Sequence, residues 1–187
     1  MKKKIIIILI SVLLLIGIGF FLYTRDNFRF KFSYEMYNHE KLSGNKEINI
    51  HIPLKNKVNY LDEKELNKFL KNGTGLLYFG YSSCPWCRNI VPILIEVAKS
   101  NNMTINYVDT HSVSVKNAIT VLNNYLRVND EGDKVLAVPD VYVIKDGKVL
   151  SHHLGTLDSY NNPYEGMSNS QKEELKKIYE DMIKELK

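Results

Sequence analysis

Cysteine is nearly absent from this chain of 187 residues, which contains only Cys84 and Cys87. The scarcity excludes a framework of several disulfides, so a disulfide can form only within this pair or transiently with another molecule. A structural zinc site needs about four ligands, and no second cysteine pair flanks the first. The adjacent His152 and His153 would point to opposite faces of a strand. We therefore expect the cysteine pair to be neither a metal site nor a purely structural disulfide, and we keep these two as the alternatives.

Acidic residues are missing from the first 25 positions, which contain Lys2, Lys3, Lys4 and Arg25. These four cations account for the whole formal net charge of +4, because the remaining 21 basic residues balance 21 acidic ones. A nearly neutral remainder offers no basic surface for a phosphate backbone, so we exclude nucleic acid as a partner.

Polar residues are also scarce between Ile5 and Tyr23, an apolar run of 19 residues. A bilayer about 30 Å thick needs roughly 20 helical residues, whereas a cleavable signal peptide usually has a core of about 7 to 15. No cysteine follows the run, which excludes a lipid-anchored lipoprotein. We predict an uncleaved membrane anchor at residues 1–24, with a cleaved signal as the alternative. The lysines before the run favour a cytoplasmic N-terminus and place the rest of the chain outside the membrane, where disulfides are permitted.

The remainder alternates between strand and helix patterns. We interpret residues 25–46 as a spacer and residues 47–187 as one domain. Apolar runs and period-two alternation predict strands at 47–52, 75–81, 103–109, 135–144 and 148–154. Helical spacing of apolar residues predicts helices at 61–71, 84–100, 115–126 and 170–186. This order predicts an α/β fold with a central mixed sheet flanked by helices.

Short motifs predict where several elements end. Asn72-Gly73 is typical of a helix C-terminus, and Asp146-Gly147 is typical of a hairpin turn. Ser170 and Glu173 have the spacing of a capping box and predict the start of the last helix. Pro92 should kink the helix in which it lies.

The cysteines lie in the run Tyr78-Phe79-Gly80-Tyr81-Ser82-Ser83-Cys84-Pro85-Trp86-Cys87-Arg88, between a strand pattern and a helix pattern. Two thiols separated by two residues at such a junction are typical of a redox-active dithiol–disulfide centre. A helix N-terminus favours an anion, so we expect the pKa of Cys84 to lie below the free-thiol value of about 8.5. Cys84 would then be the attacking thiolate and Cys87 the more covered thiol that resolves a mixed disulfide.

The order of elements around this motif resembles the thioredoxin-like superfamily. Pro92 stands five residues after the second cysteine, Val138-Pro139 precedes the penultimate strand, and Lys145-Asp146-Gly147-Lys148 looks like the thioredoxin hairpin turn. The resemblance implies a thioredoxin-like fold over residues 47–187 and a cis peptide bond before Pro139. It also implies that Pro139 abuts the disulfide and leaves the Val138 backbone free to pair with an extended substrate.

A narrower resemblance rests on the cysteine run, on Val138-Pro139-Asp140-Val141-Tyr142 and on His152-His153-Leu154-Gly155-Thr156. These motifs are similar to those of the bacteriocin transport accessory proteins, extracytoplasmic thioredoxin-like proteins of Gram-positive bacteria that are encoded beside small secreted peptide toxins. This resemblance implies disulfide formation or proofreading in exported peptides.

Tyr78 departs from the thioredoxin pattern, in which a buried aspartate six residues before the first cysteine accepts a proton from the second. An oxidant or isomerase is therefore favoured over an efficient reductase, since stabilising the reduced thiolate raises the reduction potential. Pro85 and Trp86, in place of Gly-Pro between the cysteines, also indicate a potential different from that of thioredoxin.

Several further residues could contact or tune the pair. We interpret Trp86 as an exposed substrate contact or as packed on its own helix, and Tyr78 as a core residue. Arg88 either stabilises the Cys84 thiolate or is a solvated surface residue. Three ionisable residues should lie at strand ends facing the cysteines, where they could tune a thiolate or move a proton, or else be solvated loop residues: Asp109, His111 and Asp140.

These patterns predict an extracytoplasmic thiol–disulfide oxidoreductase, anchored in the cell membrane by a single span and monomeric. We expect no metal or organic cofactor, a cysteine-containing exported peptide or protein as substrate, and a membrane redox partner that resets the Cys84–Cys87 pair. One alternative is a non-catalytic scaffold or accessory protein of a peptide-export or immunity system. Another is a thioredoxin-like protein that delivers metal or haem.

Overall fold

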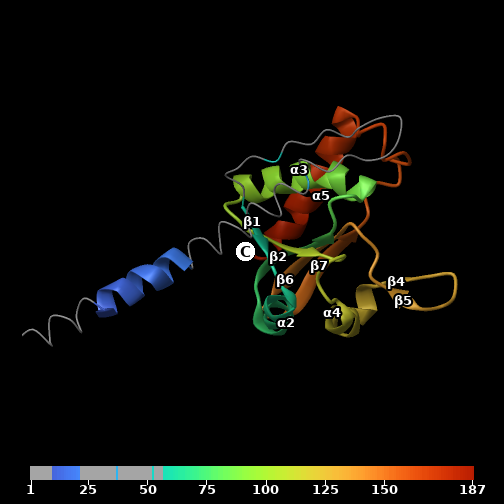
Figure 1. Ribbon diagram of the computed structural model, residues 1–187. Helices are drawn as coiled ribbons and strands as arrows, with labels where there is room; N and C mark the ends of the chain where they lie inside the picture. The colour runs from blue at the N-terminus through green and yellow to red at the C-terminus, as the bar shows by residue number, and fades with distance from the viewer. Residues whose placement is uncertain (1–9, 22–36, 38–51, 53–56) are drawn as a thin grey trace, which may run out of the picture.

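A five-stranded sheet lies at the centre of the computed structural model, which describes residues 10–21, 37, 52 and 57–187 (Figure 1). Its strands, in the spatial order β1-β3-β2-β6-β7, are β1 Val58–Tyr60, β3 Ile105–Asp109, β2 Gly75–Gly80, β6 Asp140–Lys145 and β7 Lys148–Leu154. The first three are parallel, whereas β6 and β7 are antiparallel to their neighbours. The sheet is therefore mixed, as the sequence predicts.

Helices cover both faces of the sheet (Figure 1). Because neighbouring strand residues point to opposite faces, β2 contributes Leu76 and Tyr78 to one hydrophobic core and Leu77 and Phe79 to another. The first core lies under α3 Pro85–Ser100 and α5 Asn169–Lys184, and the second under α2 Glu63–Asn72 and α4 Lys116–Val121. This layering and the strand order confirm the thioredoxin-like α/β fold.

The central strand β2 leads directly to the cysteines. All six of its residues are buried, and it pairs with β3 on one side and β6 on the other. A strand covered on both faces reads as a continuous apolar run, which is why the sequence located it almost to the residue.

The hairpin between β6 and β7 turns at Asp146 and Gly147, as predicted, with φ values of 51° and 76°. A side chain at Gly147 would collide with the backbone carbonyl of Lys71, so glycine is required there. Gly73, in contrast, ends α2 with an extended backbone at φ −76°, and its N–H donates to the Phe69 carbonyl at 2.7 Å.

The capping prediction for the last helix was wrong by two residues. Ser168, not Ser170, caps α5: its Oγ accepts the N–H of Gln171 at 3.3 Å, and Gln171 Oε1 accepts the N–H of Ser168 at 2.9 Å. Ser168 and Gln171 are three positions apart, as Ser170 and Glu173 are, so the motif alone could not distinguish the two possible helix starts.

The helix predicted at residues 115–126 is shorter than expected. α4 ends at Val121 and is followed by the 3₁₀ turn η1 Asn123–Tyr125. Asparagine side chains compete for backbone hydrogen bonds, and two of them follow each other here. A small hairpin comes next, formed by β4 Arg127–Val128 and β5 Lys134–Val135 (Figure 1). The strand predicted at 135–144 was therefore wrong in its first part, because Val135 pairs with Arg127 and β6 begins only at Asp140.

Two described residues upstream of β1 pack into the domain. Tyr37 and Ile52 are buried in the core under α3 and α5, and the Tyr37 hydroxyl lies 3.1 Å from that of Tyr78. The rest of the predicted spacer and residues 47–51 of the predicted first strand lie outside the described residues. β1, which the sequence analysis missed, has only three residues.

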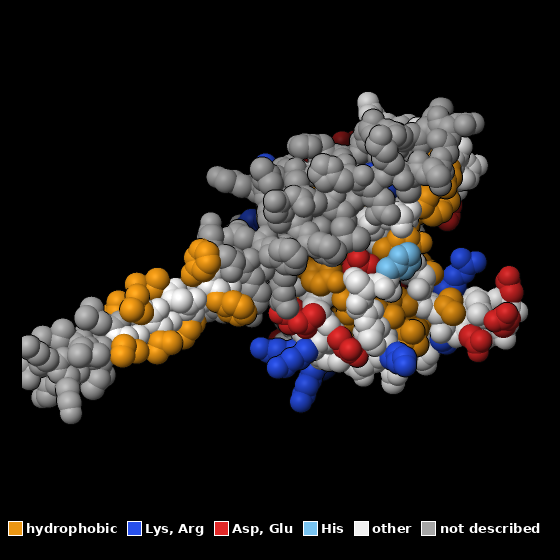
Figure 2. Space-filling view, in the orientation of Figure 1, with side chains coloured by type: hydrophobic (Ala, Val, Ile, Leu, Met, Phe, Trp, Pro, Cys, Tyr) orange, Lys and Arg blue, Asp and Glu red, His pale blue; other side chains and the backbone are white. Residues whose placement is uncertain are grey.

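Residues 10–21 form a helix in which every residue is exposed, and Figure 2 shows its apolar side chains along its length. Among the described residues, no helix is both long and apolar enough to cross a membrane. Residues 1–9 and 22–24 of the predicted anchor lie outside the described part of the chain.

Candidate active site

Cys84 and Cys87 form a disulfide at the N-terminus of α3, with Cα atoms 5.2 Å apart. Cys84 is the N-cap residue, and its Sγ accepts the N–H of Cys87 at 3.1 Å. Pro85 takes the first helical position, where its missing N–H leaves no bond unmade. Cys84 is 2% exposed and Cys87 has no exposed surface, so both cysteines are buried in the disulfide form.

The environment of Cys84 favours a negative charge on sulfur once the disulfide is reduced. The N–H groups of the first turn point towards the N-terminus of α3, and this turn contains no acidic residue. A thiolate at Cys84 would therefore be stabilised by the helix dipole and by the N–H of Cys87.

Arg88 is buried, at 2% exposure, so its interpretation as a solvated surface residue was wrong. Its Nη1 donates to the carbonyl of Ser82 at 2.9 Å, while the N–H of Cys84 donates to the carbonyl of Tyr81 at 3.2 Å. The guanidinium thus fastens the turn that precedes Cys84 and brings a positive charge to this end of α3.

Tyr78 is a core residue, as predicted. Its ring stacks on Tyr107 with centroids 5.4 Å apart, and its hydroxyl contacts that of Tyr37. Burial raises the pKa of Tyr78 well above its ordinary value, and the neighbouring Tyr37 and Asp109 add to this effect. The hydroxyl therefore stays protonated and cannot act as the carboxylate that it replaces.

Asp109 and His111 lie at the end of β3, next to the strand that leads to the cysteines. Asp109 is 1% exposed, pairs with Gly80 of β2, and accepts the backbone N–H of His111 at 2.9 Å through Oδ1. The exposed His111 ring stacks on Tyr81 with centroids 3.8 Å apart. The structure thus brings both residues to the predicted end of the sheet, and the solvated-loop interpretation fails for Asp109.

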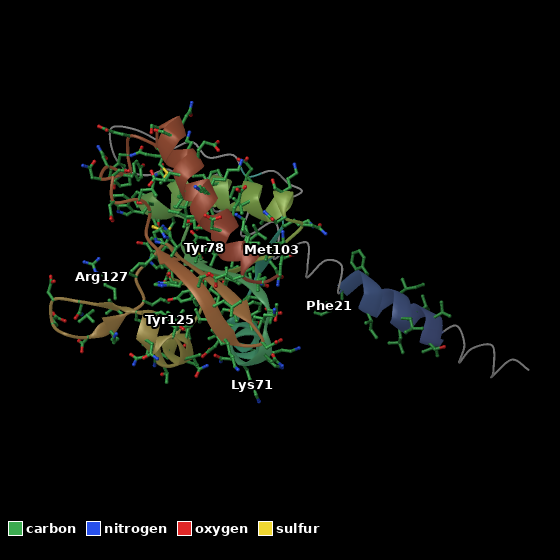
Figure 3. All side chains as sticks on the ribbon, turned by 180° about the vertical axis from the view of Figure 1, so that it is seen from behind. Phe21, Lys71, Tyr78, Met103, Tyr125 and Arg127 are labelled. Carbon is green, nitrogen blue, oxygen red and sulfur yellow. A yellow bond between two sulfur atoms is a disulfide. The ribbon has the colours of Figure 1, made fainter. Side chains whose placement is uncertain are left out.

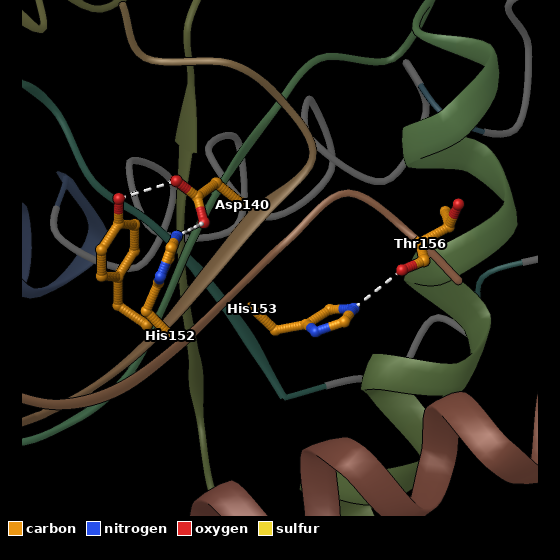
Figure 4. Close-up of polar contacts among 5 residues, drawn as sticks. Asp140, His152, His153 and Thr156 are labelled. Atoms are coloured by element: carbon orange, nitrogen blue, oxygen red, sulfur yellow. Dashed lines mark hydrogen bonds and ion pairs between the residues drawn. The ribbon is translucent and has the colours of Figure 1, made fainter. Parts of the chain in front are cut away.

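Asp140 lies at the predicted end of the sheet, but its carboxylate does not face α3. Oδ2 accepts the hydroxyl of Tyr142 at 2.7 Å, and Oδ1 lies 3.1 Å from Nε2 of His152 (Figure 4). Tyr142 belongs to the core under α2 and α4, so the side chain of Asp140 is directed to that face. Burial raises the pKa of Asp140, although the bonds from His152 and Tyr142 act in the opposite direction.

The Val138–Pro139 peptide bond is cis, as the resemblance implies. Because Asp140 pairs with Phe79, Pro139 comes next to Gly80 and the turn that carries Cys84. Pro139 is buried and its carbonyl accepts the N–H of Gly155 at 2.7 Å, whereas Val138 is partly exposed.

Trp86 is half-buried, so both interpretations hold in part. Its ring meets Tyr160 edge to face at 5.6 Å. Asn89 Nδ2 donates to the carbonyls of Pro85 and Pro163, each at 2.9 Å, and fastens the loop before α5 to the first turn of α3. No sequence pattern signals Asn89 or Tyr160, because their contacts join residues more than 70 positions apart.

His152 and His153 point to opposite faces of β7, as predicted. The His152 ring stacks on Tyr142 at 4.8 Å, whereas the His153 ring meets Tyr179 of α5 at 5.8 Å. Within the described residues, no group of three or more histidine, cysteine or acidic side chains is arranged to hold a metal ion.

Several solved thioredoxins are distantly similar to this chain. Oxidized thioredoxin O2 of Arabidopsis thaliana is 24% identical, with 68% of this chain and 96% of that one covered and a TM-score of 0.45. The reduced thioredoxin pre-protein of Schistosoma mansoni is 18% identical, with 70% and 99% covered and a TM-score of 0.46. The thioredoxin of Trypanosoma brucei brucei is 15% identical, with 72% and 99% covered and a TM-score of 0.45.

A search of the curated proteins finds no match to the sequence. The model of one protein family, described as TraF, F plasmid transfer operon protein, matches residues 24–147. The matched region includes both cysteines and Pro139, and it begins upstream of the buried Tyr37. Since this region is more than half of its length, the chain belongs to the TraF family.

Proposed function

We propose that this protein is a thiol–disulfide oxidoreductase that exchanges its Cys84–Cys87 disulfide with cysteines of exported peptides or proteins. The observation that carries the proposal is the Cys84–Cys87 disulfide at the N-terminus of α3, where the buried strand β2 leads into that helix. Asp140, the residue after Pro139, pairs with Phe79 of the same strand. A helix N-terminus lowers the pKa of a thiol, which is the property that an exchanging cysteine needs.

In the oxidising direction, a substrate thiolate attacks Sγ of Cys84 and breaks the bond to Cys87, which leaves as a thiolate and takes up a proton. A second substrate thiolate then attacks the substrate sulfur of this mixed disulfide and releases Cys84 as a thiolate. The substrate loses two electrons and two protons, and the protein pair gains both electrons. In the reverse direction, Cys84 attacks a substrate disulfide and Cys87 resolves the product.

Neighbouring residues have separate roles in this proposal. Arg88 holds the turn before Cys84 and adds positive charge that favours the thiolate. Val138 offers backbone groups to an extended substrate, and Trp86 offers a half-exposed ring. Asp109 and His111, at the neighbouring strand end, tune the thiolate or move a proton.

We further propose that residues 1–24 anchor the protein in the cell membrane, that the domain is extracytoplasmic and monomeric, and that a membrane redox partner resets the pair. The apolar run from Ile5 to Tyr23 and the exposed apolar helix at 10–21 support the anchor. The motif similarity to the bacteriocin transport accessory proteins supports small exported peptides as substrates. No metal or organic cofactor enters the proposed reaction.

The test is to mix the oxidised protein with a reduced peptide that contains two cysteines and to follow the peptide's free thiols. We expect one peptide disulfide per protein molecule, and no reaction with the double variant Cys84→Ser/Cys87→Ser. Full biological function of the double variant would contradict the proposal and support a scaffold. A reduction potential near about −120 mV would assign an oxidant, and one near about −270 mV a reductant.

A further inference from the structure

A polar cluster lies close to the candidate active site, on the face of the sheet that α2 and α4 cover. It consists of Asp140, Tyr142 and His152 (Figure 4). The ring of Tyr125 packs against Tyr142 and His152. Figure 3 shows Tyr125 on the side of α4 and Tyr78 on the side of α3. The cluster is therefore separated from the cysteines by the sheet and takes no part in the exchange step itself.

The carboxylate of Asp140 has a polar neighbour close to each of its oxygens. The hydroxyl of Tyr142 donates to Oδ2 at 2.7 Å, and Nε2 of His152 lies 3.1 Å from Oδ1. Asp140 is 1% exposed, and removing a buried carboxylate from water costs several kcal/mol unless close partners compensate. A buried acid with two such partners has a fixed orientation.

Aromatic contacts also fix the imidazole of His152. Its ring stacks on Tyr142 at 28° and meets the edge of Tyr125 at a centroid distance of 5.8 Å. Tyr125 meets Tyr142 at 6.2 Å and 89°. Since Tyr142 and His152 are direct partners across β6 and β7, the cluster ties the first residue of β6 to the neighbouring strand.

Asp140 connects this cluster to the Val138-Pro139 segment of the candidate active site. Asp140 directly follows Pro139 and is the first residue of β6, so the sheet pairing of this strand begins there. On the other side of Pro139, the chain comes from the small β4–β5 hairpin, which pairs only with itself. Before Pro139, Leu136 and Val138 pack on the core under α2 and α4. After it, the Val138-Pro139 segment is held by the bond from the Gly155 N–H to the Pro139 carbonyl and by its direct link to Asp140.

We propose that Asp140, held by Tyr142 and His152, is a positioning residue that fixes the Val138–Pro139 segment for docking of an extended peptide beside Cys84. This inference rests on the proposed exchange activity and deepens it. A peptide substrate uses the Val138 backbone, whereas a small dithiol needs only the sulfur of Cys84. Asp140 should therefore matter for peptides and not for small dithiols.

The test compares reduction of the oxidised protein by a two-cysteine peptide with its reduction by dithiothreitol. Asp140→Asn keeps the shape of the side chain but loses its charge, and His152→Gln removes the second partner. For both variants we expect the ratio of peptide rate to dithiothreitol rate to fall about tenfold through a higher KM for peptide, which corresponds to about 1.4 kcal/mol of docking free energy. Asp158→Asn, at an exposed aspartate between β7 and α5, is the matched control with an unchanged ratio.

A ratio that stays at the wild-type value in the variants, or two rates that fall together, would overturn the positioning role. A wild-type protein that reacts with dithiothreitol but not with any peptide would instead contradict the proposed function. If Asp140→Asn does not fold, His152→Gln decides, because it leaves the bond from Tyr142 to Asp140 in place.

Discussion

The half-buried His153 and the buried Asp140 lie on opposite faces of the sheet, and burial shifts their pKa values in opposite directions. Burial lowers the pKa of His153 below its ordinary 6.5, while burial raises the pKa of Asp140. In both cases the charged form is the one that burial penalises. The Thr156 carbonyl can only accept a hydrogen bond, so His153 Nε2 carries the proton in their 3.0 Å contact.

His153 should make the protein less stable in mild acid. Between pH 6.5 and its lower folded pKa, the unfolded chain binds more protons at this histidine, so the free energy of unfolding falls as the pH falls. Asp140 acts in the opposite sense, because its folded form binds the proton more tightly and its contribution falls as the pH rises.

Replacing His153 by Gln keeps an N–H donor for Thr156 but removes the titration. We expect the wild type to lose more stability than His153→Gln when urea unfolding is compared at pH 7.5 and at pH 5. Equal losses in the two proteins would show that folding does not lower the pKa of His153.

At the scale of elements, helix ends shape both the site and the fold. The N-terminus of α3 carries Cys84 as its cap, and the loop before α5 is fastened to this turn through Asn89. Ser168 and Gln171 then start α5, whose apolar face covers the core under α3. A prediction that places a helix start one or two residues away therefore assigns the wrong residues to the turn beside the cysteines.

The cap of α5 can be tested by paired substitutions. Ser168→Ala removes the side chain that accepts the Gln171 N–H, so it should lower the free energy of unfolding by about 1 kcal/mol. Ser170→Ala, inside the first turn, should change it by less than about 0.5 kcal/mol. Urea unfolding of both variants measures this difference. A larger loss of stability in Ser170→Ala would contradict the assignment and indicate that Ser170 caps the helix, as the sequence predicts.

At the scale of the whole molecule, the sequence predicts those features that residues close together in the chain determine. The cysteine motif, β2 and the hairpin turn at Asp146-Gly147 were located because neighbouring residues determine them. The place of Pro139 came from resemblance to the thioredoxin-like superfamily. Very short strands such as β1 and β4 carry too few residues for a periodic pattern.

Contacts between distant parts of the chain could not be predicted. The hydroxyl of Tyr37 meets Tyr78 across 41 positions, and Asn89 meets Pro163 across 74. Asp140 was placed at the correct end of the sheet, but its direction follows from pairing with Tyr142 and His152, which periodicity does not reveal. The family match begins at residue 24, and Tyr37, upstream of the predicted domain, is buried in the core under α3 and α5.

The central claim is that substrate cysteines bond to Cys84 and that Cys87 releases them. Its most direct test is the mass of adducts formed when a cysteine peptide disulfide is mixed with each single variant. Cys87→Ala should accumulate a one-to-one mixed disulfide through Cys84, because the resolving thiol is absent. Cys84→Ala, whose remaining thiol has no exposed surface in the native fold, should accumulate little. Equal adducts in both variants, or none in either, would contradict the account.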